Sequence, residues 1–175
     1  MSTVTAIRVM LLAAVATAAL VLATVGPAAP MAPCTGSMLS GTFSVIRGSA
    51  GAGNIVYALR LRNRSGHACF VSGLVGLRLL GKTGRTLPTR VEPAFQPGLT
   101  AARVVLRPGA QAKATARFTP DVPGPNEPTD RQCEPTAYRV RITPRPGGGT
   151  LVAPVSPPTP VCVHGRMSLS VLSPG

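Results

Sequence analysis

The clearest pattern in the chain is an alternation of side chains with a period of two, which a strand needs when only one of its faces is buried. It is cleanest between residues 54 and 62, followed by turn residues and a cysteine. One side of this segment is apolar and the other ends in two arginines: Ile55, Tyr57, Leu59 and Leu61 against Val56, Ala58, Arg60 and Arg62. The pattern predicts a half-buried strand that the rest of the fold pairs with.

Similar short segments recur along the chain, separated by glycine- and proline-rich turns, and no sustained helical periodicity appears after residue 33. We expect strands over residues 39–46, 54–62, 69–73, 75–80, 86–91, 102–107, 111–118, 138–143 and 167–172. Residues 86–91 are expected to return as a hairpin on 75–80, and the proline-rich segments 119–136 and 154–160 are expected to be loops. About eight or nine short strands with regular turns predict an all-β, immunoglobulin-like antiparallel sandwich, with a small closed barrel as the alternative.

The inward positions of the cleanest strands predict the core between the two sheets. They are Tyr57, Leu59, Leu61, Val104, Leu106, Phe118, Tyr138, Val140 and Ile142.

The first residues predict a signal peptide, not part of the fold. Arg8 is followed by an apolar run over residues 9–25, and Gly26-Pro27-Ala28 supplies the small residues that a signal peptidase reads. We therefore expect residues 1–28 to be removed and 29–175 to form a single domain in the secreted or envelope compartment. An uncleaved membrane anchor is the alternative, because the run is near the minimum length of a spanning helix.

Four cysteines behind a signal peptide predict two disulfides in an oxidising compartment. Cys34 and Cys162 each precede a terminal strand. In an immunoglobulin-like sandwich part of the first strand runs beside the last, so we expect Cys34 to pair with Cys162 and Cys69 with Cys133.

The charge balance of the chain is strongly basic, with 18 Lys and Arg, 5 Asp and Glu, and a net charge of +13. Such a charge suits an anionic partner, although an arginine-rich composition alone explains it too. Four Phe, two Tyr and no Trp leave few aromatic rings for base stacking, which disfavours nucleic acid.

The sequence disfavours three chemical sites. His67, Cys69, Cys162 and His164 would suit zinc only if both cysteines were reduced. The acidic residues of the 119–136 loop would suit calcium, but their spacing matches no known calcium loop: Asp121, Glu127, Asp130 and Glu134. Neither histidine lies in a recognisable nucleophile motif. We therefore expect no metal, no cofactor and no catalytic residues.

Taken together, the cysteines and turns resemble the secreted actinobacterial family catalogued as domain of unknown function 4232. The matching features are Cys34 ahead of the first strand, Asn63 … Cys69 … Gly73, Leu106-Arg107-Pro108-Gly109 … Ala112, and Cys133 and Cys162 ahead of strands. Leu74-Val75-Gly76 and Phe118 depart from the family pattern, in which an aromatic-proline step and a tryptophan are expected. The resemblance implies a secreted or envelope β-sandwich and leaves its activity open.

The functional expectation is a non-catalytic binding or structural module of the cell envelope. Arg60 and Arg62 share one outer strand face and Arg139 and Arg141 another, and Arg64 lies at the adjoining turn. If those strands share a sheet, the guanidinium groups suit phosphate or carboxylate. The expected partner is an anionic envelope lipid or polymer, or another envelope protein, without a membrane span after signal cleavage. An extracytoplasmic enzyme with an unrecognised site is the alternative.

Overall fold

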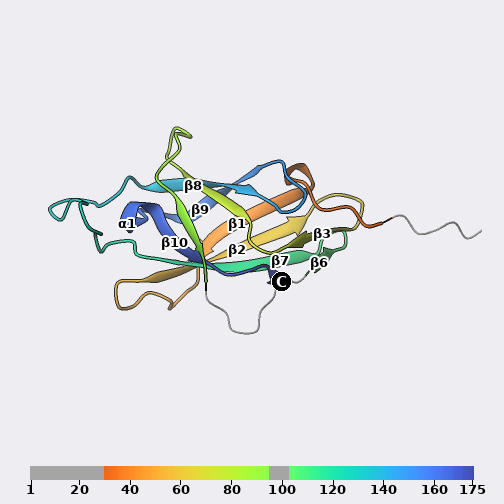
Figure 1. The fold of residues 1–175 in the computed structure, drawn as a ribbon, viewed down its shortest axis with the longest axis horizontal. Helices are drawn as coiled ribbons and strands as arrows, with labels where there is room; N and C mark the ends of the chain where they lie inside the picture. Colours follow the sequence, from red (N-terminus) through yellow and green to blue (C-terminus); the bar gives the residue numbers. More distant parts are fainter. Residues whose placement is uncertain (1–29, 95–102) are drawn as a thin grey trace, which may run out of the picture.

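The protein is seen in a computed structural model that describes residues 30–94 and 103–175. The described chain is nearly all β (Figure 1). Its strands are β1 (Leu39–Val45), β2 (Ile55–Asn63), β3 (Cys69–Ser72), β4 (Gly76–Leu80), β5 (Arg90–Pro93), β6 (Arg103–Leu106), β7 (Gln111–Phe118), β8 (Ala137–Thr143), β9 (Leu151–Thr159), β10 (Arg166–Leu169) and β11 (Ser173–Pro174). Two short helical turns complete the description, η1 (Gly36–Met38) and α1 (Cys162–Gly165).

The strands form a sandwich-like arrangement around one core, which confirms the all-β prediction. The main path of hydrogen-bonded neighbours runs β4-β8-β9-β1-β2-β7-β10-β5, β11 pairs with β7, and β3 pairs with β6 in a separate two-stranded sheet. Figure 1 shows β8, β9, β1, β2 and β7 side by side in that order. Most neighbours are antiparallel, but β9 runs parallel to β1 and β5 runs parallel to β10.

The strand predicted most clearly lies at the centre of this path. β2 pairs with β1 on one side and with β7 on the other, so its inward side chains meet both neighbours. The ring of Tyr57 packs between Phe43 and Phe118, with ring centroids 5.2 and 5.1 Å apart. Its hydroxyl donates a hydrogen bond of 2.8 Å to the carbonyl oxygen of Pro157, which ties β2 to β9.

Eight of the nine predicted core residues are buried, and Tyr138 is the error because it is 39% exposed. The alternation of β8 is interrupted at this point. Ala137 lies opposite Thr159, but Arg139 already lies opposite Pro154, so the register shifts between them. Such an irregularity re-aims the residue inside it, and the inward position at this end of β8 is taken by Ala137 instead.

Two of the segment predictions were also wrong. The expected proline-rich connection over residues 154–160 largely belongs to β9. β9 pairs with β8 chiefly before Val155 and with β1 only at Val155 and Ser156. Neither neighbour therefore requires a backbone N–H donor at every residue of β9, so the strand tolerates its prolines. The expected hairpin of residues 86–91 on 75–80 stops after the Leu80–Thr86 bridge, and the chain leaves to form β5 beside β10.

The four cysteines form two disulfides as expected, but the predicted pairing was wrong. Cys34 is joined to Cys69 and Cys133 to Cys162. The prediction placed the first strand beside the last, whereas the parallel neighbour of β1 is β9 and the chain before β1 runs beside β3. The backbone N–H of Cys34 donates to the carbonyl oxygen of Phe70 at 2.8 Å, which brings Cys34 next to Cys69.

The predicted signal peptide, residues 1–28, lies outside the described residues. Among the helices of residues 30–94 and 103–175, none is long and apolar enough to cross a membrane.

Candidate functional site

The outer face of β2 carries two of the predicted anion-binding arginines, Arg60 and Arg62, and both are exposed. In the register of the sheet, Arg60 lies between Thr42 on β1 and Lys113 on β7. The strands β1, β2 and β7 contain no aspartate or glutamate. The strand positions beside Arg60 and Arg62 therefore carry no carboxylate, whereas Arg117 near the other end of β7 shares a hollow with Glu92.

Two hollows open along this face and share residues. The first, of about 270 Å³, is lined by Ser40, Gly41, Thr42, Arg60, Arg62 and Gln111. The second, of about 530 Å³, is lined by Ser40, Arg62, Asn63, Arg64, Ser65, Pro108 and Gly109. The structure thus brings together three of the five predicted arginines, together with hydroxyl and backbone groups.

The turn that carries Arg64 is held by one buried amide. Asn63 is 1% exposed, and its Nδ2 donates to the carbonyl oxygens of His67 at 2.7 Å and Leu106 at 2.9 Å. Its Oδ1 accepts the backbone N–H and the hydroxyl of Ser65. Nearby, Arg62 Nε donates to the carbonyl oxygen of Gly109 at 3.1 Å. Sequence analysis identified the arginines and placed Asn63 in the turn, but it did not identify Asn63 as the buried amide that holds the turn. A polar residue at the next inward position after Leu61 indicates the end of a buried strand face and not a core position.

The other predicted pair, Arg139 and Arg141, lies on the outer face of β8 and is also exposed. Arg141 lies directly opposite Arg78 on β4, and a guanidinium nitrogen of Arg139 donates to the carbonyl oxygen of Lys82. Like charges directly opposite each other on neighbouring strands are unfavourable. β4, β8 and β9 contain no acidic residue either, so this is a second basic surface.

The two arginine pairs lie on the same path of strands but not on neighbouring strands. β9 and β1 lie between β8 and β2, which separates the pairs by roughly 14 Å at the usual spacing of strands. Only the pair on β2 lies beside Arg64 in the hollows described above. We therefore take the surface formed by Arg60, Arg62 and Arg64 as the candidate site. It is called the β2 edge below because it runs along the outer face of β2 to the end of that strand, although β2 itself is a central strand.

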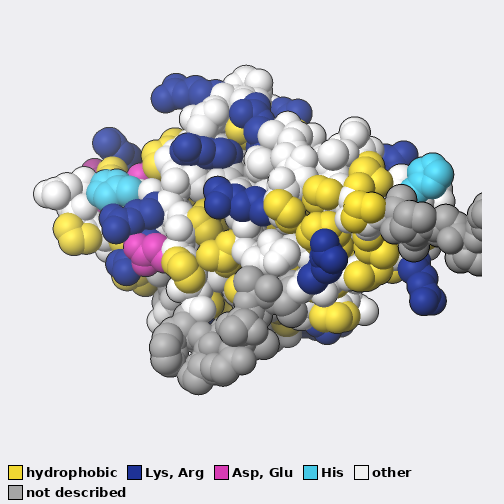
Figure 2. Space-filling view, turned by 45° about the vertical axis from the view of Figure 1, so that its right-hand side comes forward, with side chains coloured by type: hydrophobic (Ala, Val, Ile, Leu, Met, Phe, Trp, Pro, Cys, Tyr) yellow, Lys and Arg dark blue, Asp and Glu magenta, His cyan; other side chains and the backbone are white. Residues whose placement is uncertain are grey.

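The acidic residues of the chain lie elsewhere. Glu92 on β5 accepts ion pairs from Arg90 at 3.0 Å and from Arg166 at 2.9 Å. The other four lie in the segment between β7 and β8. On the face seen in Figure 2, the acidic side chains gather toward one end beside a histidine, while Lys and Arg are spread over the surface.

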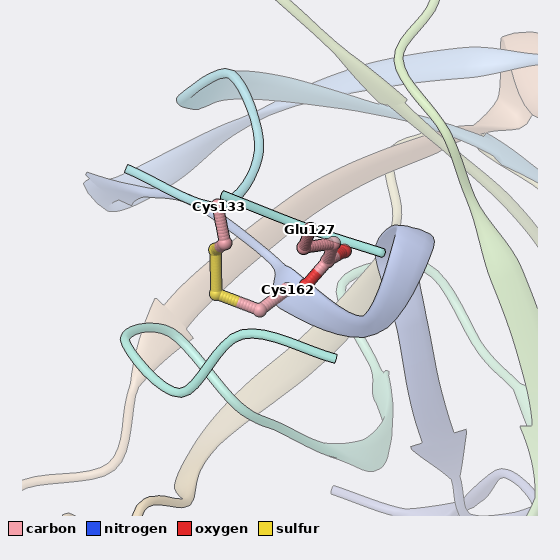
Figure 3. A group of neighbouring side chains, drawn as sticks. All are labelled: Glu127, Cys133 and Cys162. Atoms are coloured by element: carbon pink, nitrogen blue, oxygen red, sulfur yellow. A yellow bond between two sulfur atoms is a disulfide. The ribbon is translucent and has the colours of Figure 1, made fainter. Parts of the chain in front are cut away.

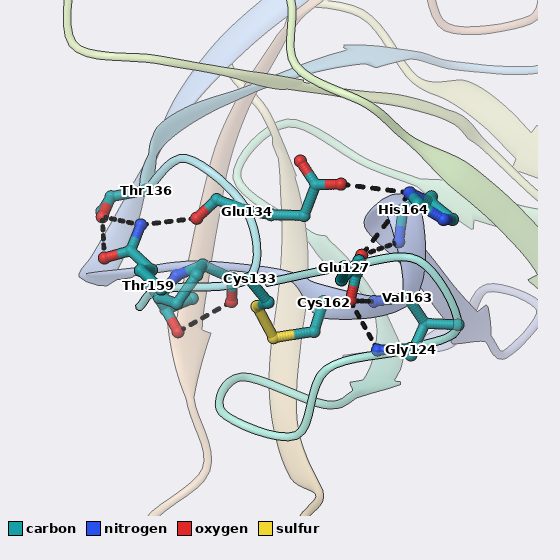
Figure 4. The surroundings of a disulfide bond; sticks show 11 residues. Gly124, Glu127, Cys133, Glu134, Thr136, Thr159, Cys162, Val163 and His164 are labelled. Carbon is teal, nitrogen blue, oxygen red and sulfur yellow. Dashed lines mark hydrogen bonds and ion pairs between the residues drawn. A yellow bond between two sulfur atoms is a disulfide. The ribbon is translucent and has the colours of Figure 1, made fainter. Parts of the chain in front are cut away.

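A buried carboxylate, Glu127, organises that acidic end. Its side chain is 1% exposed and accepts backbone N–H groups from Gly124 at 2.6 Å, Val163 at 2.8 Å and His164 (Figure 4). Val163 and His164 both have left-handed backbone angles, with φ of 57° and 55°, so their N–H groups turn toward one anion. Burial alone would raise the pKa of Glu127, but these backbone hydrogen bonds outweigh it and hold the pKa below its usual value.

The same cluster lies against the disulfide of Cys133 and Cys162, as Figure 3 shows. The carboxylates of Glu134 and Glu127 approach Nδ1 of His164 at 3.4 and 3.6 Å. Burial raises the pKa of Glu134, and the neighbouring charge of Glu127 raises it further, although His164 acts in the opposite direction.

This arrangement suits a structural role better than a metal site. Both oxygens of Glu127 already accept backbone donors, so the carboxylate is the internal anion that closes the α1 turn. A zinc site of His67, Cys69, Cys162 and His164 is excluded. Its two cysteines are oxidised in different disulfides. Of the considered calcium ligands, Glu127 and Glu134 lie together with His164, without Asp121 or Asp130.

Neither histidine ring contacts a nucleophile within the described part of the chain. His164 Nε2 lies 3.2 Å from the carbonyl oxygen of Pro125, and its other nitrogen faces the two carboxylates. This geometry stabilises a turn, and among the described residues no serine, threonine or cysteine side chain lies at hydrogen-bond distance from the imidazole.

Comparisons with known proteins identify a family but no characterised relative. No curated protein and no solved structure matched the chain. The family model described as a domain of unknown function, DUF4232, matches residues 34–172. That span runs from the first disulfide cysteine to the buried Leu172 near the C-terminus and covers every strand from β1 to β10. The chain therefore belongs to the DUF4232 family of domains of unknown function.

Proposed function

We propose that the protein is a non-catalytic, extracytoplasmic binding module that holds an anionic component of the cell envelope against its β2 edge. The observation that carries this proposal is the pair of adjoining hollows that Arg60, Arg62 and Arg64 line and to which no aspartate or glutamate contributes. Guanidinium groups bind phosphate and carboxylate through paired N–H donors, so an anion would complete this surface.

The organisation of the site also supports binding. Side chains that line both hollows come from paired strands and from a turn that the buried Asn63 holds in place. The backbone of such a site loses little conformational freedom when a ligand binds. Two disulfides support an oxidising compartment, in agreement with the predicted signal peptide.

Co-sedimentation tests the proposal directly. The protein should sediment with vesicles of anionic phospholipid or with a purified acidic wall polymer at low salt. Binding should fade as the Debye length falls from ~30 Å at 0.01 M to ~8 Å at physiological ionic strength. The triple variant R60Q/R62Q/R64Q should lose this binding, while R139Q/R141Q should keep most of it.

The pair on β8 serves as the control for net charge. If R139Q/R141Q weakened binding as much as the triple variant, the whole basic surface would be responsible, and the β2 edge would not be a site. If the two arginine pairs on β2 and β8 acted as one binding unit, only R60Q/R62Q/R139Q/R141Q would abolish binding.

A further inference from the structure

The two hollows on the β2 edge form one continuous track. Ser40 and Arg62 line both, whereas Arg60 lines only the first and Arg64 only the second. Alternate residues of a strand are roughly 6.8 Å apart along its length, so Arg60 and Arg62 present cations in line at that interval. Arg64 extends the row beyond the end of β2.

Arg62 is suited to serve both hollows at once. A guanidinium group carries five N–H donors, and Nε of Arg62 is already used by the carbonyl oxygen of Gly109. This bond directs the plane of the group, and in the described part of the chain the donors on its two terminal nitrogens form no hydrogen bond. No described residue forms an ion pair with Arg60, Arg62 or Arg64. One arginine can therefore donate to an anion on either side.

We propose that the β2 edge binds two phosphate groups of one linear polymer, one in each hollow, with Arg62 bridging them. This inference rests on the proposed function and names its ligand class: an extended polyphosphate or polyphosphodiester chain. A surface of separate lipid headgroups presents mobile anions with no fixed connection. A connected chain, once held in one hollow, offers its next phosphate to the other at a high effective concentration.

The hydroxyl and amide groups of the track are consistent with such a ligand. Thr42 and Gln111 line the first hollow, and Ser40 lies where the two meet. These uncharged donors bind phosphate oxygens while the guanidinium groups balance the charge. The track holds no acidic side chain that would repel a polyanion.

The test compares ligands of increasing connectivity at one low salt concentration. Affinity per phosphate is measured by calorimetry for inorganic phosphate, tripolyphosphate, long-chain polyphosphate and polyglycerol phosphate. Binding should tighten at least ~100-fold from inorganic phosphate to the polymers, as expected when a second contact becomes intramolecular. Vesicles of anionic phospholipid form a separate arm and should bind more weakly per phosphate than the polymers.

Three variants locate the effect. The gain is the increase in affinity per phosphate from inorganic phosphate to the polymers. R62Q should remove most of this gain, because both hollows lose their shared donor. R62K keeps the charge but lacks the planar fork, so it should also lose most of the gain. R141Q removes the same charge from β8 and should leave the gain intact. Thermal unfolding of each variant checks that the fold is retained.

Failure of this inference differs from failure of the proposed function. Equal affinity per phosphate for inorganic phosphate and polymers, or an equal loss in R141Q and R62Q, would overturn the track while leaving anion binding in place. Binding to vesicles but not to polymers would do the same. If none of these anions bound the parent protein, both proposals would fall.

Discussion

Two buried polar residues, Glu127 and Asn63, determine the local geometry at opposite ends of the molecule. Each lies inside a turn and satisfies several backbone groups that would otherwise be buried without partners. A single side chain in such a position replaces secondary structure as the source of hydrogen bonds. Glu127 fixes the left-handed α1 turn, and Asn63 fixes the turn that presents Arg64.

Changing Glu127 to Ala should destabilise the protein by about 3 kcal/mol or more, because three backbone N–H groups would lose their acceptor. The matched change E134Q should be neutral or slightly stabilising at pH 7, since burial raises the pKa of Glu134 and makes its ionised form unfavourable. Urea unfolding of both variants measures the difference. Equal effects would show that Glu127 has no special role.

Acid should weaken the parent protein through the same residue. The pKa of Glu127 is lower in the folded protein than its ordinary value of about 4.3, so its ionised form contributes stability at all pH values above that. The contribution should be lost as the pH falls through the folded pKa. A pH series of unfolding free energies should therefore decline more steeply below about pH 4 in the parent than in E127Q. Parallel curves would contradict this assignment.

Replacing Asn63 by Asp tests the turn beside the candidate site. The shape is kept, but the two N–H donors to His67 and Leu106 are lost, and a charge is introduced at a buried position. We expect a loss of ~2–4 kcal/mol and weaker anion binding than in the control T83A, which changes an exposed turn residue outside the site. An unchanged melting temperature would mean that the turn does not depend on the amide.

At the scale of elements, alternation identified the strands well and their partners poorly. Tyr57, Leu59 and Leu61 are buried as their period-two pattern predicts. Tyr138 fits the same pattern but lies at a register shift, which depends on how β8 meets β9 and is not encoded within seven residues. The prolines of β9 were misread for a similar reason, because tolerance of a missing donor depends on which neighbours a strand has.

The disulfide pairing failed because it depends on strand order. Four cysteines permit three pairings, and the correct one followed from segments that run side by side: Pro33 beside Phe70, and the chain after β9 beside the segment before β8. The arginines of the candidate site were identified from residue type and face alone. Their division into a β2 edge and a separate β8 pair required the topology.

Truncating side chains to alanine should show which of the predicted core residues face the core. L59A and V140A remove side chains that are fully buried and should each cost ~2–4 kcal/mol. Y138A removes a larger side chain from an exposed position and should cost much less than either. Denaturant unfolding of the three variants measures the loss of unfolding free energy in each. The loss in Y138A should be less than half of the smaller of the losses in L59A and V140A.

Each disulfide should stabilise the protein by constraining its unfolded chain. The bridges span sequence separations of 35 and 29 residues, for which chain entropy gives ~3.5–4 kcal/mol each. Peptide mapping without reduction should recover Cys34 joined to Cys69. A fragment that joins Cys34 to Cys162 would show that the strand order around β1 is wrong.

At the scale of the whole molecule, the small number of acidic residues decides how the charge is distributed. Five carboxylates stand against 18 basic side chains, and the four in the β7–β8 segment and the one on β5 leave the faces of β1, β2, β7 and of β4, β8, β9 without any. A net charge of +13 attracts many anions without selecting among them. Selectivity has to come from local geometry, and we propose that the adjoining hollows of the β2 edge provide it.

The most direct test of this account follows the arginine side chains themselves. In a titration with polyglycerol phosphate, the Nε–H signals of arginine are recorded by nuclear magnetic resonance and assigned with single Arg→Lys variants. The account predicts saturable shifts at Arg60, Arg62 and Arg64, with Arg139 and Arg141 nearly unchanged at the same ligand concentration. Shifts of equal size at all five arginines, without saturation, would contradict it and leave only the net charge of the molecule.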